Sequence, residues 1–377
     1  MKLRATLLLA AAMSLLTRLP LTANERKGET GEADQFQAEI KKLGGYVHRD
    51  NQRPGNPVVA VDLRGPQVTD AALEMLASQK ELKTLVLVGA KVTDAGLQRL
   101  AKLDKLESLD LVGRELDDAG LASLRNLKHL QTLVLNAPRV TDTGLKPLAG
   151  LSNLESLHLH GTQVTGSGLK SLAGLAKLEA IDLRRARVND AGLAALAELP
   201  ALTTLVLEGD HLSDAGLAHL KPLTKLEHLV LAGGKVTDRG LASLAGLTEL
   251  QTVSLHNYQI SDKGLAHLKG LTRLDTLIVA GPQITDAGIK QLAALTKLTT
   301  LSLDGTQVTE AGLEGVKGFQ HLESLRISGP HVTDEGLEHL AGFRDLRDLN
   351  LAHGHVTDRG LKQLHGLANL RSLALGA

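Results

Sequence analysis

A short signature recurs along the chain at one constant interval, and this regularity limits the possible folds more than any other feature. In most copies an apolar residue is followed two positions later by aspartate. The thirteen apolar residues that begin the copies, evenly spaced, are Val68, Val92, Leu116, Val140, Val164, Val188, Leu212, Val236, Ile260, Ile284, Val308, Val332 and Val356. A fixed period of this size is typical of proteins that stack one small unit many times. We therefore expect one elongated array rather than several globular domains.

Each unit contains two different apolar spacings. In the second copy, Leu85 and Leu87 alternate with other residues, which is the two-residue period of a strand. Leu97, Leu100 and Leu103 then recur at every third position, as on one side of a short helix. One strand and one short helix cannot bury their apolar side chains alone. The units are therefore expected to stack, with leucines filling a continuous core.

The leucine pattern L-x-x-L-x-L at positions 82–87, repeated at this constant interval, resembles the leucine-rich repeat family over residues 58–377. The continuation V-T-D-x-G-L at positions 92–97 resembles the subtype found in F-box substrate receptors and in exported bacterial repeat proteins. The resemblance implies an α/β fold, a leucine-rich-repeat solenoid in the form of a curved right-handed horseshoe. A parallel sheet would line its concave side and short helices its convex side. Thirteen repeats and a partial terminal strand would make up this domain.

Two sets of equivalent positions, here called columns, are assigned structural roles. Glycine fills the Gly96 column in every copy except the first, which has Ala72, and this predicts a close approach between neighbouring coils. Aspartate fills most of the Asp94 column, with Gly166 and Glu310 as exceptions. One carboxylate per coil beside a helix start favours helix capping over a calcium ladder, because calcium needs six to eight oxygen ligands.

A third column departs from the family pattern. The family usually has asparagine or cysteine two residues before the Val68-type position, where the side chain hydrogen-bonds the turn. This chain has neither residue there in any copy. Its turn backbone groups must find other partners, and Thr162 and Thr306 are predicted to substitute locally.

The N-terminal part of the chain, ahead of the repeats, falls into three segments. Residues 1–23 have a basic start at Lys2 and Arg4 followed by an apolar run, and they predict a secretory signal peptide. Residues 24–32 are polar and are expected to form a flexible leader. Residues 33–57 are expected to form an N-terminal cap, made of a helix and a hairpin. The chain is thus expected to be exported, periplasmic or secreted, and not inserted in a membrane after cleavage.

The two ends of the solenoid are expected to differ. Phe36 and Tyr46 in the cap are expected to cover the N-terminal end of the core. At the other end the chain reaches Leu373 and Leu375 inside a fourteenth strand of the repeat series, without a sequence pattern for a cap. An uncovered coil favours self-association through this edge.

Composition excludes several classes of site and partner. The chain has no cysteine, so no disulfide framework, thiolate zinc site or cysteine nucleophile can form. It has 42 basic and 42 acidic residues and no basic stripe, which argues against a nucleic-acid partner. The sequence contains no cofactor motif, and no cofactor is expected.

Side chains that alternate with the strand leucines should line the concave face, where function is expected. A polar cluster occurs midway along the array, and a second group includes the one aromatic residue in the strand and turn halves of the repeats. The residues chosen as candidates for partner binding are His158, His160, Asp182, Arg184, Arg185, Glu208, His256, Asn257, Tyr258 and Arg326.

Three functions are compatible with these candidates. The favoured one is a non-enzymatic scaffold that binds a protein partner on the concave face. A substrate-receptor adaptor is the first alternative, although residues 24–57 are too few for an F-box. The second is a secreted metal-dependent enzyme that uses His158, His160 and Asp182, since two imidazoles and a carboxylate can bind metal or transfer protons. No catalytic motif supports it, and the expectation is no metal and no catalytic residue.

Overall fold

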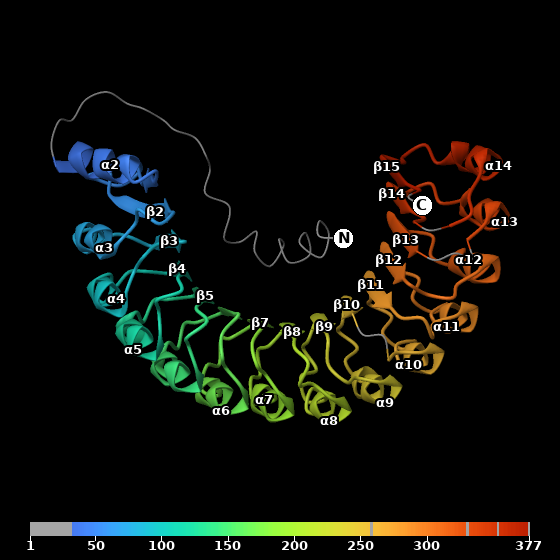
Figure 1. Cartoon of the computed structure of the whole chain (residues 1–377), viewed down its shortest axis with the longest axis horizontal. Coiled ribbons are helices and arrows are strands. Elements are labelled where there is room, and N and C mark those ends of the chain that lie inside the picture. Colours follow the sequence, from blue (N-terminus) through green and yellow to red (C-terminus); the bar gives the residue numbers. More distant parts are fainter. Residues whose placement is uncertain (1–31, 257–258, 329–331, 353, 376–377) are drawn as a thin grey trace.

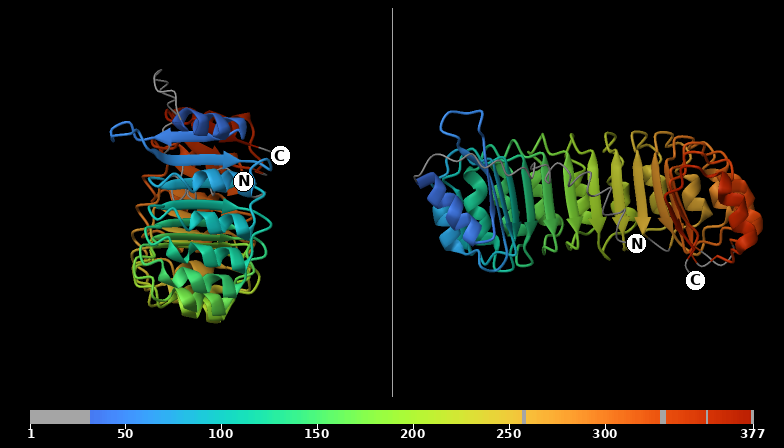
Figure 2. Two further views of the ribbon diagram at one scale, coloured as in Figure 1. Left: turned by 90° about the vertical axis from the view of Figure 1, so that its left-hand side faces the viewer. Right: turned by 90° about the horizontal axis from the view of Figure 1, so that it is seen from above.

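A computed structural model describes residues 32–256, 259–328, 332–352 and 354–375. Within these residues the chain forms a solenoid with one sheet of 15 strands, arranged in sequence order from β1 to β15. The strands line the inner side of a deep arc, and the helices follow its outer side (Figure 1). Viewed from above, the strands lie side by side along the whole arc (Figure 2). The predicted fold class is confirmed.

The strands are five residues long in most coils and pair in parallel, except for the antiparallel pair β1–β2. Their bounds are β1 Tyr46–Arg49, β2 Val58–Arg64, β3 Thr84–Val88, β4 Ser108–Val112, β5 Thr132–Asn136, β6 Ser156–His160, β7 Ala180–Arg184, β8 Thr204–Glu208, β9 His228–Ala232, β10 Thr252–His256, β11 Thr276–Ala280, β12 Thr300–Asp304, β13 Ser324–Ser328, β14 Asp348–Asn350 and β15 Ser372–Ala374.

The convex side consists of short α-helices, some of which are continued or replaced by 3₁₀ turns. The α-helices are α2 Glu32–Lys42, α3 Asp70–Leu76, α4 Asp94–Leu100, α5 Asp118–Leu121, α6 Gly166–Leu169, α7 Asp190–Leu196, α8 Asp214–Ala218, α9 Asp238–Leu241, α10 Asp262–Ala266, α11 Asp286–Gln291, α12 Glu310–Val316, α13 Asp334–Leu337 and α14 Asp358–Leu361. The 3₁₀ segments are η1 Ala122–Asn126, η2 Asp142–Gly150, η3 Lys170–Leu172, η4 Ala242–Leu244, η5 Glu338–Leu340 and η6 Lys362–Gly366.

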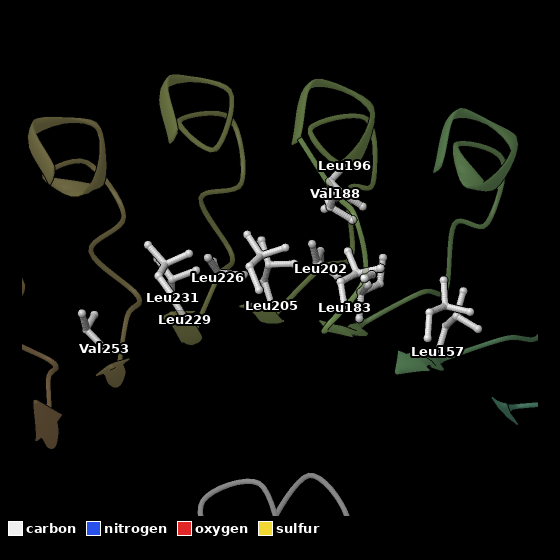
Figure 3. Packing of buried hydrophobic residues seen from close by; sticks show 14 of the residues in the cluster. Leu157, Leu183, Val188, Leu196, Leu202, Leu205, Leu226, Leu229, Leu231 and Val253 are labelled. Atoms are coloured by element: carbon white, nitrogen blue, oxygen red, sulfur yellow. The ribbon is translucent and has the colours of Figure 1, made fainter. Parts of the chain in front are cut away.

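Equivalent apolar side chains stack from coil to coil between the sheet and the helices. Leu157, Leu205, Leu229 and Val253 belong to one such column, and each is at most 1% exposed. They follow one another along the interior of the arc (Figure 3). Full burial of a leucine side chain stabilises the fold by about 1.5–3 kcal/mol. The repeated leucines are therefore the main source of stability, as the sequence pattern indicates.

The aspartates of the Asp94 column connect neighbouring coils. Asp214 Oδ1 accepts a hydrogen bond from the backbone N–H of Thr237, in the next coil, at 2.8 Å, and its Oδ2 accepts one from Thr237 Oγ1 at 2.7 Å. The same pair of bonds recurs along the solenoid from Asp70, Asp118, Asp142, Asp190, Asp238, Asp262, Asp286 and Asp334. The prediction of capping needs a correction, because each carboxylate binds the N-cap residue of the next coil rather than its own helix.

This contact also explains the glycine column. A Cβ atom on Gly216 would lie 2.2 Å from Asp190 Oδ1, and one on Gly240 would lie 2.5 Å from Asp214 Oδ1. Ala72 belongs to the first coil, which follows the cap strand β1 and has no preceding repeat with an aspartate at the equivalent position. The prediction of a close approach between coils is therefore confirmed, and the group approached is the carboxylate.

Two positions of the column lack aspartate: Glu310 keeps a carboxylate, whereas the Gly166 position has no side chain at all. A Cβ at Gly166 would lie 2.5 Å from the backbone nitrogen of Gly192 and 2.8 Å from the carbonyl carbon of Ala191. Asn189 instead accepts a hydrogen bond from its own helix, with its Oδ1 3.3 Å from Gly192 N. Helices α6 and α7 are therefore packed too closely for any side chain at position 166.

Thr162 and Thr306 were predicted to replace the asparagine or cysteine that the family has in its turns, and both hydrogen-bond the turn backbone. Thr162 and Thr306 are each 2% exposed. Their hydroxyls donate hydrogen bonds to the carbonyl oxygens of Leu159 and Leu303, at 3.2 Å and 3.5 Å.

The ends of the array are covered unequally. Phe36 and Leu43 pack against the core beside fully buried Ile40. Tyr46, expected to share this role with Phe36, is 69% exposed, so that expectation was wrong. On β15 and just after it, Leu373 and Leu375 are 43% and 37% exposed.

Candidate functional site

The central polar cluster lies on β6 and β7, near the middle of the arc (Figure 1). The parallel register places His158 directly opposite Asp182. Side chains at these positions alternate with the buried Leu157, Leu159 and Leu183, so the strand period turns them to the concave side. The register thus brings together two residues of the polar cluster that the sequence analysis placed midway along the array.

Three side chains converge on one oxygen of Asp182. Asp182 Oδ2 lies 2.9 Å from His160 Nε2, 3.6 Å from His158 Nδ1 and 2.7 Å from Arg184 Nη2. The other oxygen, Oδ1, accepts hydrogen bonds from the backbone N–H of Arg184 at 3.0 Å and from its Nε at 3.1 Å. On the far side of the His158 ring, Nε2 lies 2.9 Å from Ser156 Oγ.

The cluster keeps Asp182 ionised. Burial alone would raise the pKa of Asp182, but hydrogen bonds from His158, His160 and Arg184 outweigh it and hold the pKa well below the usual range of an aspartate. His158 and Asp182 are only 4% and 3% exposed. His158 and Asp182 are therefore shielded from solvent by the residues around them. His160 and Arg184 are half-buried and reach the concave surface.

Arg185 and Glu208 border the cluster on its β8 side. Arg185 has a left-handed backbone with φ of 57° and a side chain that is 82% exposed. Its Nε lies 4.0 Å from Glu208 Oε1, which is a loose ion pair. Glu208 is also the register partner of Arg184 on the neighbouring strand. The two charged residues thus extend the cluster into solvent.

Arg326 lies apart from the cluster, on β13. Its Nε donates to Asp304 Oδ1 at 2.6 Å, and Ser328 Oγ donates to the same oxygen at 2.7 Å. Arg326 is thus held by the neighbouring strand β12. Asp304 was not chosen from the sequence, although its place in the same column as Arg184 could have indicated it.

The second sequence-predicted group is described only in part. His256, at the end of β10, is exposed, and its Nε2 lies 3.0 Å from Ser254 Oγ. Asn257 and Tyr258 lie outside the described residues.

Asp110 on β4 is a polar residue that sequence reasoning missed. Burial raises its pKa, more than Arg64 lowers it, and its Oδ1 is buried without a hydrogen-bond partner among the described residues. The sequence signal was the position of Asp110 in the His158 column between Val86 and Val134, whose side chains enclose it.

An open hollow of about 560 Å³ lies at the edge of the coils, lined by residues that include Arg187, His211 and Lys235. None of the eight candidate residues that the structure describes lines it. The His158–Asp182 cluster is thus part of an open concave sheet rather than of this hollow.

Comparison with known proteins agrees with the repeat architecture. A family model described as a leucine-rich repeat matches residues 150–173, 223–245, 320–341 and 344–364. These four segments are leucine-rich repeats, and the other coils of the solenoid repeat the same strand and helix arrangement.

Solved structures of leucine-rich repeat proteins share the fold of this chain. An internalin, InlF, from Listeria monocytogenes is 24% identical with a TM-score of 0.66, over 90% of this chain and 94% of that one. A leucine-rich repeat protein from Leptospira interrogans is 18% identical with a TM-score of 0.56, over 92% and 100% of the two chains. A search of curated proteins found no match.

Proposed function

We propose that this leucine-rich repeat protein is a non-enzymatic scaffold that binds another protein on its concave face. The observation that carries the proposal is that two concave arginines are already fixed in place by carboxylates. Arg184 is held by Asp182, and Arg326 is held by Asp304. Arginine is enriched among the residues that dominate binding energy, and side chains fixed before binding lose less entropy on association.

Apolar surface beside these arginines supports a protein partner. Val206 and Val230 follow Asp182 in the same concave column, and Ile278 lies further along it. Val230 and Ile278 are partly exposed. A mixture of apolar contacts and fixed charges is characteristic of protein interfaces. The equal numbers of acidic and basic residues argue against a nucleic-acid partner.

The adaptor remains the first alternative. The part of the N-terminal region that the structure describes, residues 32–57, holds the single helix α2 and the β1–β2 hairpin. A helical bundle of the F-box type has no counterpart in those residues.

Export of the protein is also part of the proposal. It rests on residues 1–23, which lie outside the described residues. Among the helices that the structure does describe, none combines the length and the apolar character needed to cross a bilayer.

Self-association through β15 is a second candidate role. The exposed Leu373 and Leu375 favour it, because apolar side chains on an outer strand gain from being covered. Light scattering of the wild-type protein and of a Leu373→Gln, Leu375→Gln variant tests this role. A wild-type protein that is monomeric at high concentration would exclude it.

The scaffold role is tested by capture of partners from an envelope extract with Arg184→Ala and Arg326→Ala proteins. Arg239→Ala, on convex helix α9, is the matched control. A specific partner should be retained by the control and reduced by each concave variant. Equal capture by all three variants would contradict the proposal.

A further inference from the structure

Three potential metal ligands are gathered in the central cluster. His158, His160 and Asp182 each offer one ligand atom, and these atoms all lie within 4.8 Å of one another. They come from two adjacent strands, and two of the three side chains are almost fully buried. The distances from Asp182 Oδ2 to the two imidazole nitrogens are 2.9 and 3.6 Å. Ligands on a tetrahedral zinc ion with bonds of about 2.0–2.1 Å are separated by about 3.3 Å, so the two spacings that involve Asp182 are close to those of ligands on one ion.

The hydrogen bonds within the cluster conflict at one atom. His160 Nε2 faces the carboxylate oxygen of Asp182 at 2.9 Å and the guanidinium Nη2 of Arg184 at 3.1 Å. A guanidinium only donates hydrogen bonds and a carboxylate only accepts them. One imidazole nitrogen either carries a proton and donates a hydrogen bond, or is bare and accepts one. Nε2 therefore satisfies one of these neighbours and opposes the other. A metal ion would remove the conflict, because it binds the bare nitrogen and the carboxylate together.

We propose that His158 Nδ1, His160 Nε2 and Asp182 Oδ2 bind one divalent transition-metal ion of the zinc or cobalt type, with Arg184 as the cation that it displaces. Two imidazoles and one carboxylate suit such ions better than calcium or magnesium, which prefer oxygen ligands. Three protein ligands leave a fourth tetrahedral position for water or for a group of a partner. This proposal does not depend on the scaffold role.

The surrounding groups hold the ligands in the required orientation. Ser156 Oγ lies 2.9 Å from His158 Nε2 and so leaves Nδ1 directed at Asp182. The backbone N–H of Arg184 donates to Asp182 Oδ1, which leaves Oδ2 directed at the imidazoles. Contacts of this kind fix the ring and carboxylate orientation at metal sites in general. Both contacts persist when the Arg184 side chain moves.

Arg184 has a second carboxylate within reach. Glu208 is its register partner on β8, and the Glu208 side chain is 42% exposed. The present ion pair of Glu208 is the loose one with Arg185, at 4.0 Å. A guanidinium displaced from Asp182 can therefore pair with Glu208 instead of being left without a counter-ion.

The test is a titration of the purified, chelator-treated full chain with Co²⁺, followed by the visible absorption of tetrahedral cobalt and by calorimetry. We expect one ion per chain. Arg184→Met should tighten binding at least tenfold, because it removes the competing positive charge. His160→Gln should weaken binding at least tenfold, since one of three ligands is lost.

The matched control is His256→Gln. His256 also has a serine hydroxyl beside it, Ser254 Oγ at 3.0 Å, but belongs to no described group of three potential ligands. It should bind Co²⁺ like the wild type. Circular dichroism verifies that each variant is folded. The proposal is overturned if neither the wild type nor Arg184→Met binds one equivalent, if only Arg184→Met binds, or if His160→Gln and His256→Gln behave alike.

Discussion

A Cβ atom on Gly216 would lie 2.2 Å from Oδ1 of Asp190, which is held by Ser213 of the same coil as Gly216. Aspartate in one coil and glycine in the next are thus two halves of one contact, repeated along the solenoid. Neither residue is explained by its own coil alone. The aspartate satisfies a backbone N–H that would otherwise lack a partner at the helix start, and the glycine leaves room for it.

This relationship predicts that Gly216→Ala destabilises the protein by about 1–2 kcal/mol. The steric cost of about 1–3 kcal/mol outweighs the helix propensity that alanine gains. Urea unfolding measures the change. Gly246→Ala is the control, because a Cβ there meets nothing within 4 Å, and its stability should be unchanged or raised.

A double-mutant cycle tests the cause. In an Asp190→Ala background the obstructing carboxylate is gone, so Gly216→Ala should no longer destabilise. Additive losses in the double variant would show that the glycine is needed for another reason.

Gly166 and Glu310 are the two exceptions in the aspartate column. Replacing them by aspartate should change the stability of the protein in different ways. Gly166→Asp should destabilise the protein, because a Cβ there meets the backbone of positions 191 and 192 at 2.8 Å or less. Glu310→Asp should be neutral or stabilising, since Glu310 Oε1 already accepts a hydrogen bond from Thr333 Oγ1 at 2.6 Å, as the consensus aspartates do from their own partners. Thermal unfolding measures both. A stabilised Gly166→Asp protein would refute the close packing of α6 and α7.

The negative charge of Asp110 should lower the free energy of unfolding at neutral pH. Its pKa is raised in the folded state, so the folded protein holds this proton more tightly than the unfolded chain does. Stability is therefore lost as pH rises from the ordinary aspartate pKa, about 3.9, through the raised value. The free energy of unfolding of the Asp110→Asn variant should exceed that of the wild type by about 1 kcal/mol at pH 7, and should equal it below about pH 4.

Urea unfolding at the two pH values is the measurement. Asp304→Asn is the control because Asp304 is paired with Arg326 at 2.6 Å, is not among the groups that shift the pKa of Asp110, and should show no gain at pH 7. A pH-independent effect at Asp110 would contradict burial of its charge.

The sequence predicted much of what recurs from coil to coil, but not the partner of the repeated aspartates. The strand leucines, the helix leucines and the close coil contact at the Gly96 column follow from one period and elementary packing, and the substitute role of Thr162 follows from the departure from the family pattern. The pairing of His158 with Asp182 followed as well, because a parallel register places equivalent positions side by side.

What the period does not specify is how a side chain turns once its neighbours are in place. Arg184 folds back onto Asp182, two positions earlier on its own strand, and this choice depends on the rotamers of both residues. The target of each aspartate lies in the following coil, so it depends on the rise and rotation between coils. Asp110 is half-buried, with its Oδ1 atom shielded from solvent, between register partners that are valines on both neighbouring strands.

The concave face as the binding surface is tested most directly by site-specific photo-crosslinking within one coil. A photoreactive residue is placed at position 208, on concave strand β8, or at position 218, on convex helix α8. After illumination in envelope extract, position 208 should give a discrete adduct with a partner protein and position 218 should not. An adduct from position 218 that equals or exceeds that from position 208, or no adduct from position 208, would contradict the account.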